Sequence, residues 1–374
     1  MPTAAPGIAI LGAGLFAKEA HLPALKALGS DAPPLLAVYS RSEKSSRECS
    51  EAAVAMGLEP APAIYRDGAE MNLDALLARP DITTVIVVLP ITLQPSIILK
   101  AFAAGKHVLS EKPVAPDVAG GISLIKTYNE KYKKNLVWRI AENFEAEPGF
   151  RAAGKAIAEG KIGKVNFFKA VVVNHIDVDN KWYKTPWRTV PDYQGGFLLD
   201  GGVHTIAALR TMLTHPLTHL SAFASLNHEY LKPHDTIHAV VQAGSHFHGI
   251  VELSFGAPTK SVPPADEFVI TGSEGWLTVN SVRVEDKSVM RVLIKRAVKP
   301  KAEGEPATEV EEVIDNPKMG VEAEFRSFFD AVAGKPTLEI GDPLEALKDV
   351  VFIQAGLNSG GELVDLEKLA AEGK

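Results

Sequence analysis

Residues 7–25, GIAILGAGLFAKEAHLPAL, decide the fold class of this chain. A short apolar run, residues 7–11, leads directly into the turn Gly12-Ala13-Gly14-Leu15-Phe16-Ala17 and then into a segment of helical length. The pattern G-x-G-x-x-A at a strand-to-helix junction is typical of dinucleotide binding, because the glycines permit a tight turn and close backbone approach to a pyrophosphate. We therefore expect Gly12, Ala13, Gly14, Leu15 and Phe16 to bind a dinucleotide at the helix N-terminus.

Strand-like and helix-like segments alternate through the first third of the chain. This order indicates βαβ units around a parallel sheet with right-handed crossovers and helices on both faces. We predict an N-terminal doubly wound Rossmann domain over residues 1–141. Its expected strands are residues 7–11, 35–39, 84–89, 108–109 and 136–140, and its expected helices are residues 15–28, 42–56, 73–77, 96–104 and 118–132.

Residues 142–374 have a different pattern, and a chain of 374 residues is long enough for a second domain. Strand-like segments follow one another with short turns, which predicts an α/β domain with a mostly antiparallel, open-faced sheet. Whether the last helix packs back on the first domain is left open. The expected strands are residues 165–173, 220–225, 237–242, 249–255, 268–271 and 276–279, the helices are residues 150–159, 203–213, 322–332 and 343–357, and the loops are residues 257–264 and 300–317.

Composition and charge exclude several classes of protein. The chain is 46% hydrophobic and 23% charged with a net charge of −7, so it has no basic excess of the kind that nucleic-acid binders show. The longest apolar run, residues 85–89, is far too short to span a membrane. A single cysteine, Cys49, and a start without a secretory pattern predict a cytoplasmic protein.

The end of the second strand bears on the choice of nicotinamide cofactor. NAD sites place an acid there to bind the ribose 2′-hydroxyl, but this strand ends in Ser40-Arg41 and the first acid is Glu43. A serine and a guanidinium attract a 2′-phosphate, so we expect NADP (NADPH), with NAD as the less favoured alternative. A structural interpretation is compatible with this one: Ser40 and Glu43 have capping-box spacing, and Arg41 could be solvated.

Two further motifs follow. The first is Ser110-Glu111-Lys112-Pro113, and the second is Gly195-Gly196-Phe197-Leu198-Leu199-Asp200-Gly201-Gly202-Val203-His204. Taken singly, a Lys-Pro turn or an Asp/His pair four residues apart is common on protein surfaces. Together with the glycine turn, and in this order, they resemble the glucose–fructose oxidoreductase / inositol dehydrogenase / MocA family over nearly the whole chain.

This resemblance implies a Rossmann domain, an α/β domain that binds substrate through residues 142–374, and a nicotinamide between the two. It places Lys112 near nicotinamide and substrate, and Asp200 and His204 at the substrate. It also implies a cis bond between Lys112 and Pro113, a sugar-like or polyol-like small-molecule substrate, and a homodimer or homotetramer formed through the open sheet.

The residue types suit an oxidoreductase that transfers a hydride between the nicotinamide and a carbonyl or alcohol carbon. Asp200 and His204 share one face of a helix, so the carboxylate can orient the imidazole. The imidazole can then move a proton at the substrate oxygen. The Lys112 ammonium can stabilise the negative charge that develops on that oxygen.

The same resemblance adds Pro90, Glu111, Asn143, Trp187 and Arg188 to the cofactor site. Trp187 has interface packing as an equal alternative. The chain departs from the family at Ile91 and Gln94, where many members have Asn and His. These departures weaken the case for side-chain hydrogen bonds to the cofactor from Ile91 and Gln94, and we expect backbone contact near Pro90.

Three alternative interpretations compete with this one. A metal site at His246-x-His248 is disfavoured because alternate residues of a strand share a face without having to converge on an ion, and because no Cys partner is present, so no metal is expected. A catalytically silent regulator of the same fold, similar to the fungal galactose repressor, has no need of the Lys112, Asp200 and His204 set. An aromatic-diol dehydrogenase would favour Tyr over His204. The substrate pocket is expected around residues 175–188.

Overall fold

The computed structural model describes residues 6–261, 267–298 and 308–373. The chain divides into two compact units that do not follow a single cut in the sequence. The first unit contains residues 1–116, 120–143 and 321–347. The second contains residues 117–119, 144–320 and 348–374. A late stretch of the chain therefore completes the core of the N-terminal unit.

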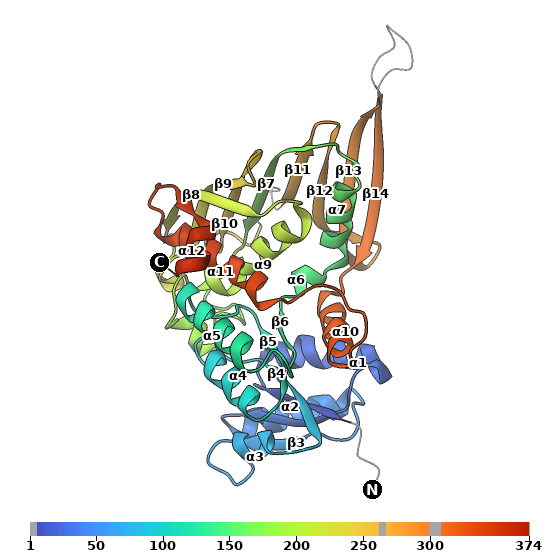
Figure 1. Cartoon of the computed structure of the whole chain (residues 1–374), viewed down its shortest axis with the longest axis vertical. Coiled ribbons are helices and arrows are strands. Elements are labelled where there is room, and N and C mark those ends of the chain that lie inside the picture. Colours follow the sequence, from blue (N-terminus) through green and yellow to red (C-terminus); the bar gives the residue numbers. More distant parts are fainter. Residues whose placement is uncertain (1–5, 262–266, 299–307, 374) are drawn as a thin grey trace. The chain divides into compact units, whose positions relative to one another are not determined.

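The first unit is built on a six-stranded parallel sheet with strand order β3-β2-β1-β4-β5-β6 (Figure 1). This is the strand order of a doubly wound dinucleotide-binding fold, so the predicted fold class is confirmed. The strands are β1 Gly7–Leu11, β2 Leu35–Ser40, β3 Ala63–Arg66, β4 Ile82–Val87, β5 His107–Glu111 and β6 Trp138–Ala141. The helices are α1 Leu22–Leu28, α2 Glu43–Ala55, α3 Leu73–Leu77, α4 Gln94–Ala103, α5 Val118–Lys131 and α10 Gly320–Val332.

Strand β3 was missed by the sequence prediction. It has four residues, lies at the edge of the sheet, and only Tyr65 within it is buried. A short strand with one buried side chain has no apolar run, which was the signal used for the other strands. The helix expected over residues 15–28 is present, but a π-helical turn, Ala17–His21, precedes α1.

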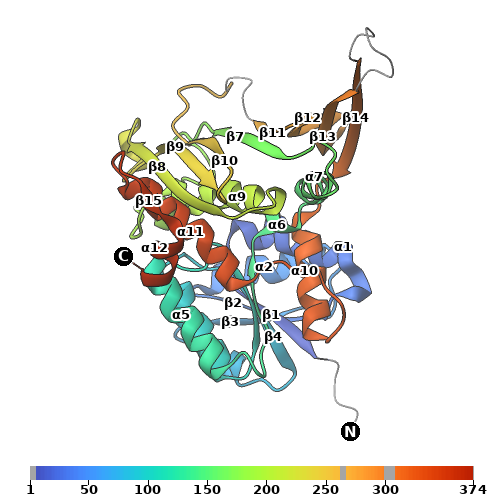
Figure 2. The same ribbon diagram turned by 45° about the horizontal axis from the view of Figure 1, so that its top comes forward.

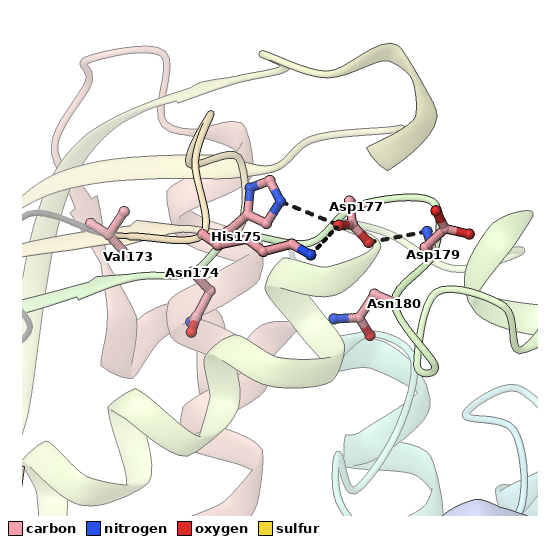
Figure 3. Close-up of a pocket in the computed structure, with 7 residues that line it drawn as sticks. Val173, Asn174, His175, Asp177, Asp179 and Asn180 are labelled. Carbon is pink, nitrogen blue, oxygen red and sulfur yellow. Dashed lines mark hydrogen bonds and ion pairs between the residues drawn. The ribbon is translucent and has the colours of Figure 1, made fainter.

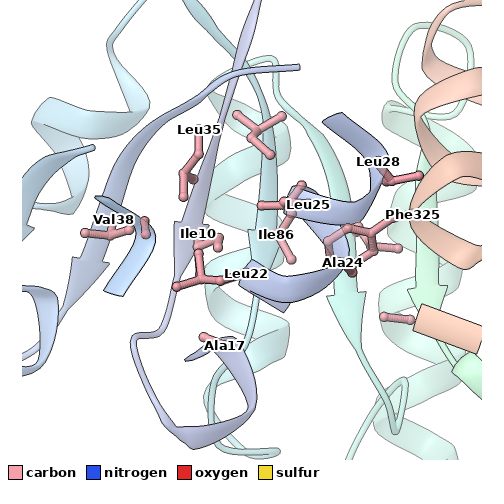
Figure 4. Close-up of a cluster of buried hydrophobic side chains, with 14 of the residues drawn as sticks. Ile10, Ala17, Leu22, Ala24, Leu25, Leu28, Leu35, Val38, Ile86 and Phe325 are labelled. Atoms are coloured by element: carbon pink, nitrogen blue, oxygen red, sulfur yellow. The ribbon is translucent and has the colours of Figure 1, made fainter. Parts of the chain in front are cut away.

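The core of this unit lies between the sheet and its helices. Every residue of β1 is buried, because a parallel strand in the middle of such a sheet is covered on both faces. Figure 4 shows Ile10 and Ile86 of the sheet together with Leu22 and Leu25 of α1, and Phe325 of α10 joins the same cluster. Phe325 explains why residues 321–347 belong to this unit.

The second unit contains a nine-stranded sheet of order β14-β13-β12-β11-β7-β10-β9-β8-β15, antiparallel except between β7 and β10. Figure 2 shows α7, α9 and α11 on one face of this sheet. The strands are β7 Val165–Val173, β8 Leu217–Ser225, β9 Thr236–Ala243, β10 Phe247–Ser254, β11 Glu267–Gly272, β12 Gly275–Val284, β13 Lys287–Val298, β14 Thr308–Pro317 and β15 Val364–Asp365. The helices are α6 Asn143–Ala146, α7 Pro148–Ala158, α8 Pro186–Thr189, α9 Phe197–Met212, α11 Pro343–Asn358 and α12 Leu366–Glu372.

The other face of this sheet carries exposed apolar side chains, and burial along β9 alternates from Ile237 to Ala243. The prediction of a mostly antiparallel, open-faced sheet is therefore confirmed. The prediction of a loop over residues 300–317 is wrong for residues 308–317, which form β14. This edge strand was not predicted because its sequence is acidic and largely exposed. Charged residues on edge strands commonly protect a sheet against unwanted pairing with other strands. Residues 262–264 of the first expected loop and residues 300–307 of the second lie outside the described residues.

Candidate functional site

The glycine turn follows β1 as expected, and the fold itself requires the first glycine. Gly12 has φ of 117°, and a Cβ there would lie 2.0 Å from the carbonyl oxygen of Val88. Its backbone N–H donates to the carbonyl of Tyr39 at 2.8 Å, which ties the turn to β2. Ala17 is fully buried, so a small residue is also needed where the helix packs on the strand.

Gly14 stands in a different environment. A Cβ at Gly14 would meet no described atom within 4 Å, so packing does not explain the absence of a side chain there. Open space over the backbone at a helix N-terminus is what a pyrophosphate needs in order to approach the N–H groups. The turn therefore fits a dinucleotide, with Ala13, Leu15 and Phe16 as its flanking residues.

The end of β2 brings together more positive charge than the sequence indicated. Ser40 is paired in register with Arg66 at the end of β3, and Arg41 is exposed. Arg66 Nε lies 3.2 Å from Glu43 Oε2, and Arg47 also binds this carboxylate. The hydrogen bond from Arg47, followed by the charge of Arg66, lowers the pKa of Glu43. Arg66 was missed because β3 was missed.

The capping-box interpretation of Ser40 and Glu43 is wrong. Ser40 is the last residue of β2, and the residue that caps α2 is Ser42, whose hydroxyl accepts a hydrogen bond from Ser45 N at 3.3 Å. An N-cap residue directly precedes its helix, and two residues separate Ser40 from Glu43, the first residue of α2. The Ser40 side chain is therefore not used as a helix cap.

The Glu-Lys-Pro motif lies where β5 ends. Glu111 is the last residue of this strand, and the peptide bond between Lys112 and Pro113 is cis, as predicted. The carboxylate of Glu111 is buried and accepts a hydrogen bond from His21 Nε2 at 2.8 Å. His21 was not among the expected site residues, and its polar partner lies 90 positions away in the sequence.

The predicted residues of the first unit share one edge of its sheet. Gly12, Arg41, Pro90, Lys112 and Asn143 follow the carboxyl ends of β1, β2, β4, β5 and β6. In open α/β sheets, ligands bind beyond this edge, where the strand order reverses. The order reverses here between β1 and β4, directly beside the glycine turn.

In the second unit, helix α9 carries both Asp200 and His204. It begins at Phe197, six residues before the predicted start, after Gly195 and Gly196, which both have positive φ. Asp200 is buried, and Arg188 Nε donates to its Oδ2 at 2.6 Å. The sequence predicts that Asp200 orients His204 and that Arg188 contacts cofactor. The hydrogen bond shows that Arg188, from α8, binds the Asp200 carboxylate.

Aromatic rings lie beside His204 and Arg188. His204 stacks on Phe144 with ring centroids 4.7 Å apart, and the Arg188 guanidinium lies 4.0 Å above the Trp187 ring. Tyr193 contacts Trp187, and its buried hydroxyl has no hydrogen-bond partner among the described residues. Burial, and then the charge of Asp200, raise the pKa of Tyr193. Tyr193 was not predicted as a site residue, because a single tyrosine before Gly195 belongs to no recognisable motif.

A polar pocket of about 490 Å³ lies beyond the end of β7 in the second unit. Figure 3 shows the His175 ring directed toward Asp177, and Nε2 lies 3.5 Å from the carboxylate. His175 Nδ1 lies 2.7 Å from the carbonyl of Ala257, which holds the ring in place. The pocket is lined by Val173, Asn174, His175, Asp177, Asp179, Asn180 and Lys260. It involves the first part of the predicted substrate loop.

The described residues contain neither a candidate metal cluster nor a candidate membrane span. Within residues 6–261, 267–298 and 308–373, no group of three or more His, Cys, Asp or Glu side chains is placed to hold a metal ion. Among the helices in those same ranges, none combines the length and apolar character that crossing a membrane requires.

The fold and the site define a two-domain, dinucleotide-binding α/β protein. The model of the oxidoreductase family with an NAD-binding Rossmann fold matches residues 7–138, and the model of the GFO/IDH/MocA C-terminal domain matches residues 150–278. The chain therefore belongs to the GFO/IDH/MocA oxidoreductase family, as its motifs indicated.

Similar proteins extend over nearly the whole chain. Dehydrogenase FPY6 of Fusarium mangiferae is 38% identical over 94% of this chain and 96% of its own length. A dTDP-3,4-didehydro-2,6-dideoxy-alpha-D-glucose 3-reductase of Saccharopolyspora spinosa is 28% identical over 87% of this chain and 86% of its own. The crystal structure of an oxidoreductase from Thermotoga maritima has a TM-score of 0.80 and 30% identity, covering 98% of this chain and 99% of that one.

Proposed function

We propose that this protein is an NADP(H)-dependent oxidoreductase that interconverts a carbonyl and an alcohol carbon of a sugar-like or polyol-like molecule. One observation carries the proposal. The carboxyl edge of the six-stranded sheet gathers a glycine turn with open space over Gly14, the Ser40–Arg41 pair, and Lys112. Phosphate-binding, specificity and charge-stabilising groups thus share the edge at which this fold binds dinucleotides.

The preference for NADP over NAD rests on charge at the end of β2. Arg41 and Arg66 offer guanidinium groups next to Ser40, and guanidinium is the side-chain group best matched to phosphate. The nearby acid, Glu43, binds Arg47 and Arg66. A 2′-phosphate in this region would meet Arg41, Arg66 and Ser40.

The protein's own groups would supply position and proton. The bound cofactor supplies the hydride; His204 would give or take the proton at the substrate oxygen, and Lys112 would stabilise negative charge on that oxygen. Phe144 holds the His204 ring by stacking, and Arg188 fixes the carboxylate of Asp200. We propose that Asp200 orients His204 from this fixed position. Glu111, Asn143, Pro90 and Trp187 would complete the cofactor site.

A polyhydroxylated substrate suits the pocket beyond β7. Its carboxylates, amides and imidazole can exchange several hydrogen bonds with hydroxyl groups, and one relative of this chain is named as a reductase of a nucleotide-linked sugar. Residues 1–141 would bind cofactor and residues 142–374 substrate. The second region would also form a homodimer or homotetramer through the open sheet. A cytoplasmic location stays a prediction.

The cofactor assignment is tested by titrating the purified protein with NADPH and NADH. Arg41→Ala and Arg66→Ala should each weaken NADPH about 10- to 100-fold, because a charge-assisted hydrogen bond is lost, and leave NADH unchanged. Lys126→Ala, which removes an exposed cation from α5, is the control. Equal weakening of both nucleotides would contradict the assignment.

The chemical assignment is tested with NADPH and a panel of aldoses, ketoses and inosose-type ketones. His204→Ala should slow turnover about 100- to 10,000-fold while NADPH still binds, because only proton transfer is removed. His238→Ala, an exposed histidine on the outward face of β9, should behave like wild type. Unchanged turnover in His204→Ala would remove His204 from the mechanism.

The same panel separates the enzyme from a catalytically silent regulator. A regulator would bind the nucleotide and turn over none of the substrates, whereas the enzyme would oxidise NADPH with at least one of them and lose that turnover in His204→Ala. The presence of Lys112, Asp200 and His204 together favours the enzyme, because nucleotide binding alone needs none of the three.

A further inference from the structure

His21 forms a buried polar contact that the proposed function does not use. It is the last residue of the π-helical turn Ala17–His21, and it is completely shielded from solvent. Its Nε2 donates to Glu111 Oε1 at 2.8 Å, while Nδ1 has no hydrogen-bond partner among the described residues. A buried nitrogen left without a partner carries a free-energy cost, and native proteins tend to keep such costs at functional positions.

The ring of His21 is fixed from two further sides. It contacts Phe16 edge-on with ring centroids 5.0 Å apart, and it contacts Phe325 of α10, also at 5.0 Å. Phe16 belongs to the glycine turn. One side chain therefore touches both the turn that we assign to the pyrophosphate and the strand end that carries the Glu-Lys-Pro motif. π-helical turns are rare and occur frequently at functional sites.

The contact with Glu111 bears on Lys112. Glu111 is the last residue of β5, and successive side chains of a strand point to opposite sides. A carboxylate held in the interior by His21 therefore sets the direction in which the next residue leaves the sheet. Lys112 is that residue, and a shift of about 1 Å in a reacting group can cost about 100-fold in rate.

We propose that His21 is a positioning residue: by holding the Glu111 carboxylate, it fixes the backbone from which the Lys112 amine reaches its substrate. This inference rests on the proposed function, because it assigns His21 a part in placing Lys112. A purely structural role would lower stability without a specific effect on turnover, so the two roles predict different results.

The test compares four single variants and one double variant of the full-length protein. His21→Leu removes the donor at similar size, His21→Gln keeps an amide N–H near the position of Nε2, and Glu111→Gln weakens the acceptor. His107→Gln is the matched control, since His107 also lies on β5 and its Nδ1 accepts a hydrogen bond from Val137 N at 3.0 Å. Each variant is measured for thermal unfolding, NADPH affinity, kcat, and hydrogen exchange of the peptide spanning residues 107–116.

We expect His21→Leu to lower kcat about 10- to 100-fold, to leave NADPH affinity within a few-fold, and to speed exchange around Lys112. His21→Gln should recover most of the lost rate, and His107→Gln should match wild type. Combining His21→Leu with Glu111→Gln should cost little more than His21→Leu alone, because the two residues act as one unit.

Two outcomes overturn the inference. One is a folded His21→Leu variant with wild-type kcat and wild-type exchange at residues 107–116. The other is a loss of rate that His21→Gln does not recover. If the wild-type protein shows neither NADPH binding nor turnover, the proposed function fails instead. The exchange measurement then still decides whether His21 holds this segment.

Discussion

The two sheets of this protein bury their side chains in different ways. The parallel sheet is covered on both faces, so that all five residues of β1 are buried. The nine-stranded sheet is covered on one face, and β9 alternates between buried and exposed residues from Ile237 onward. In the first unit, polar groups can gather only where strands end, and the candidate cofactor residues lie at that edge. In the second unit, a whole face stays available for another protein surface.

Neighbouring phenylalanines on β7 test this difference most strongly. Phe168 is 2% exposed and Phe167 is 51% exposed. Phe168→Ala should reduce the free energy of unfolding by about 3–5 kcal/mol, because it empties a packed core position. Phe167→Ala should change it by less than about 0.5 kcal/mol. Urea unfolding of both variants measures the difference.

Protein concentration sharpens the same comparison. If the open face binds a second copy, Phe167→Ala should weaken that association, and sedimentation should show it. Equal losses of stability in the two variants would mean that the outward face is as well packed as the inner one. The description of an open sheet would then be wrong.

Substitution of the two glycines of the turn should give the next largest change in the free energy of unfolding. Gly12→Ala should destabilise the protein by about 1–3 kcal/mol, because a side chain there is strained at positive φ and meets the Val88 carbonyl. Gly14→Ala should be neutral or stabilising by up to about 1 kcal/mol, since it meets no described atom. Thermal unfolding measures both, and an NADPH titration should show weakened binding in Gly14→Ala. Wild-type NADPH affinity in that variant would contradict the pyrophosphate assignment.

Lowering the pH should have a smaller effect on the free energy of unfolding. Arg79 donates two hydrogen bonds to Asp81, at 3.0 and 2.7 Å, and this lowers the pKa of Asp81 in the folded state. The stability from this pair is therefore present above pH 3.8, the ordinary pKa, and is lost as pH falls through the lowered folded value. The pair is partly exposed, so the contribution should stay below about 1 kcal/mol.

Asp81→Asn should remove that part of the acid dependence when the free energy of unfolding is followed from neutral pH to pH 3. Asp315→Asn provides the comparison in the second unit, because Arg291 binds Asp315 in the same two-pronged way between β13 and β14. Arg291 is more exposed than Arg79, at 37% against 24%, so a larger acid effect at Asp315 than at Asp81 would contradict the role of arginine burial.

The smallest expected signal is thiol labelling of the native protein. Cys49 on α2 is fully buried, and burial raises its pKa to about 11. Little thiolate forms near pH 8, so a disulfide reagent should react slowly until the first unit unfolds. Because Cys49 is the single cysteine of the chain, its labelling reports on that unit alone. Rapid reaction of the folded protein would show that α2 opens independently of the rest.

Much of the fold could be predicted from the sequence. The strands of the parallel sheet that have apolar runs were found, and so were the succession of strands β7 to β12 and the cis bond before Pro113. Strands β3, β13, β14 and β15 were not. β3 and β15 are short edge strands and β14 is an acidic edge strand, so these three have little buried apolar surface and no hydrophobic run. β13 has buried Met290, Val292 and Ile294 at alternate positions, a pattern that the sequence prediction overlooked. The start of α9 was placed too late, since two glycines in sequence resemble a loop.

The sequence by itself determined the candidate site residues that we propose: the glycine turn, Ser40–Arg41, Lys112, and the spacing of Asp200 and His204. Only the tertiary structure decided their partners. Arg66 lies beside Ser40, Arg188 binds Asp200, and His21 binds Glu111. The reason is geometric: helix and strand periods fix which neighbours share a face, whereas contacts between residues up to 90 positions apart depend on the path of the whole backbone.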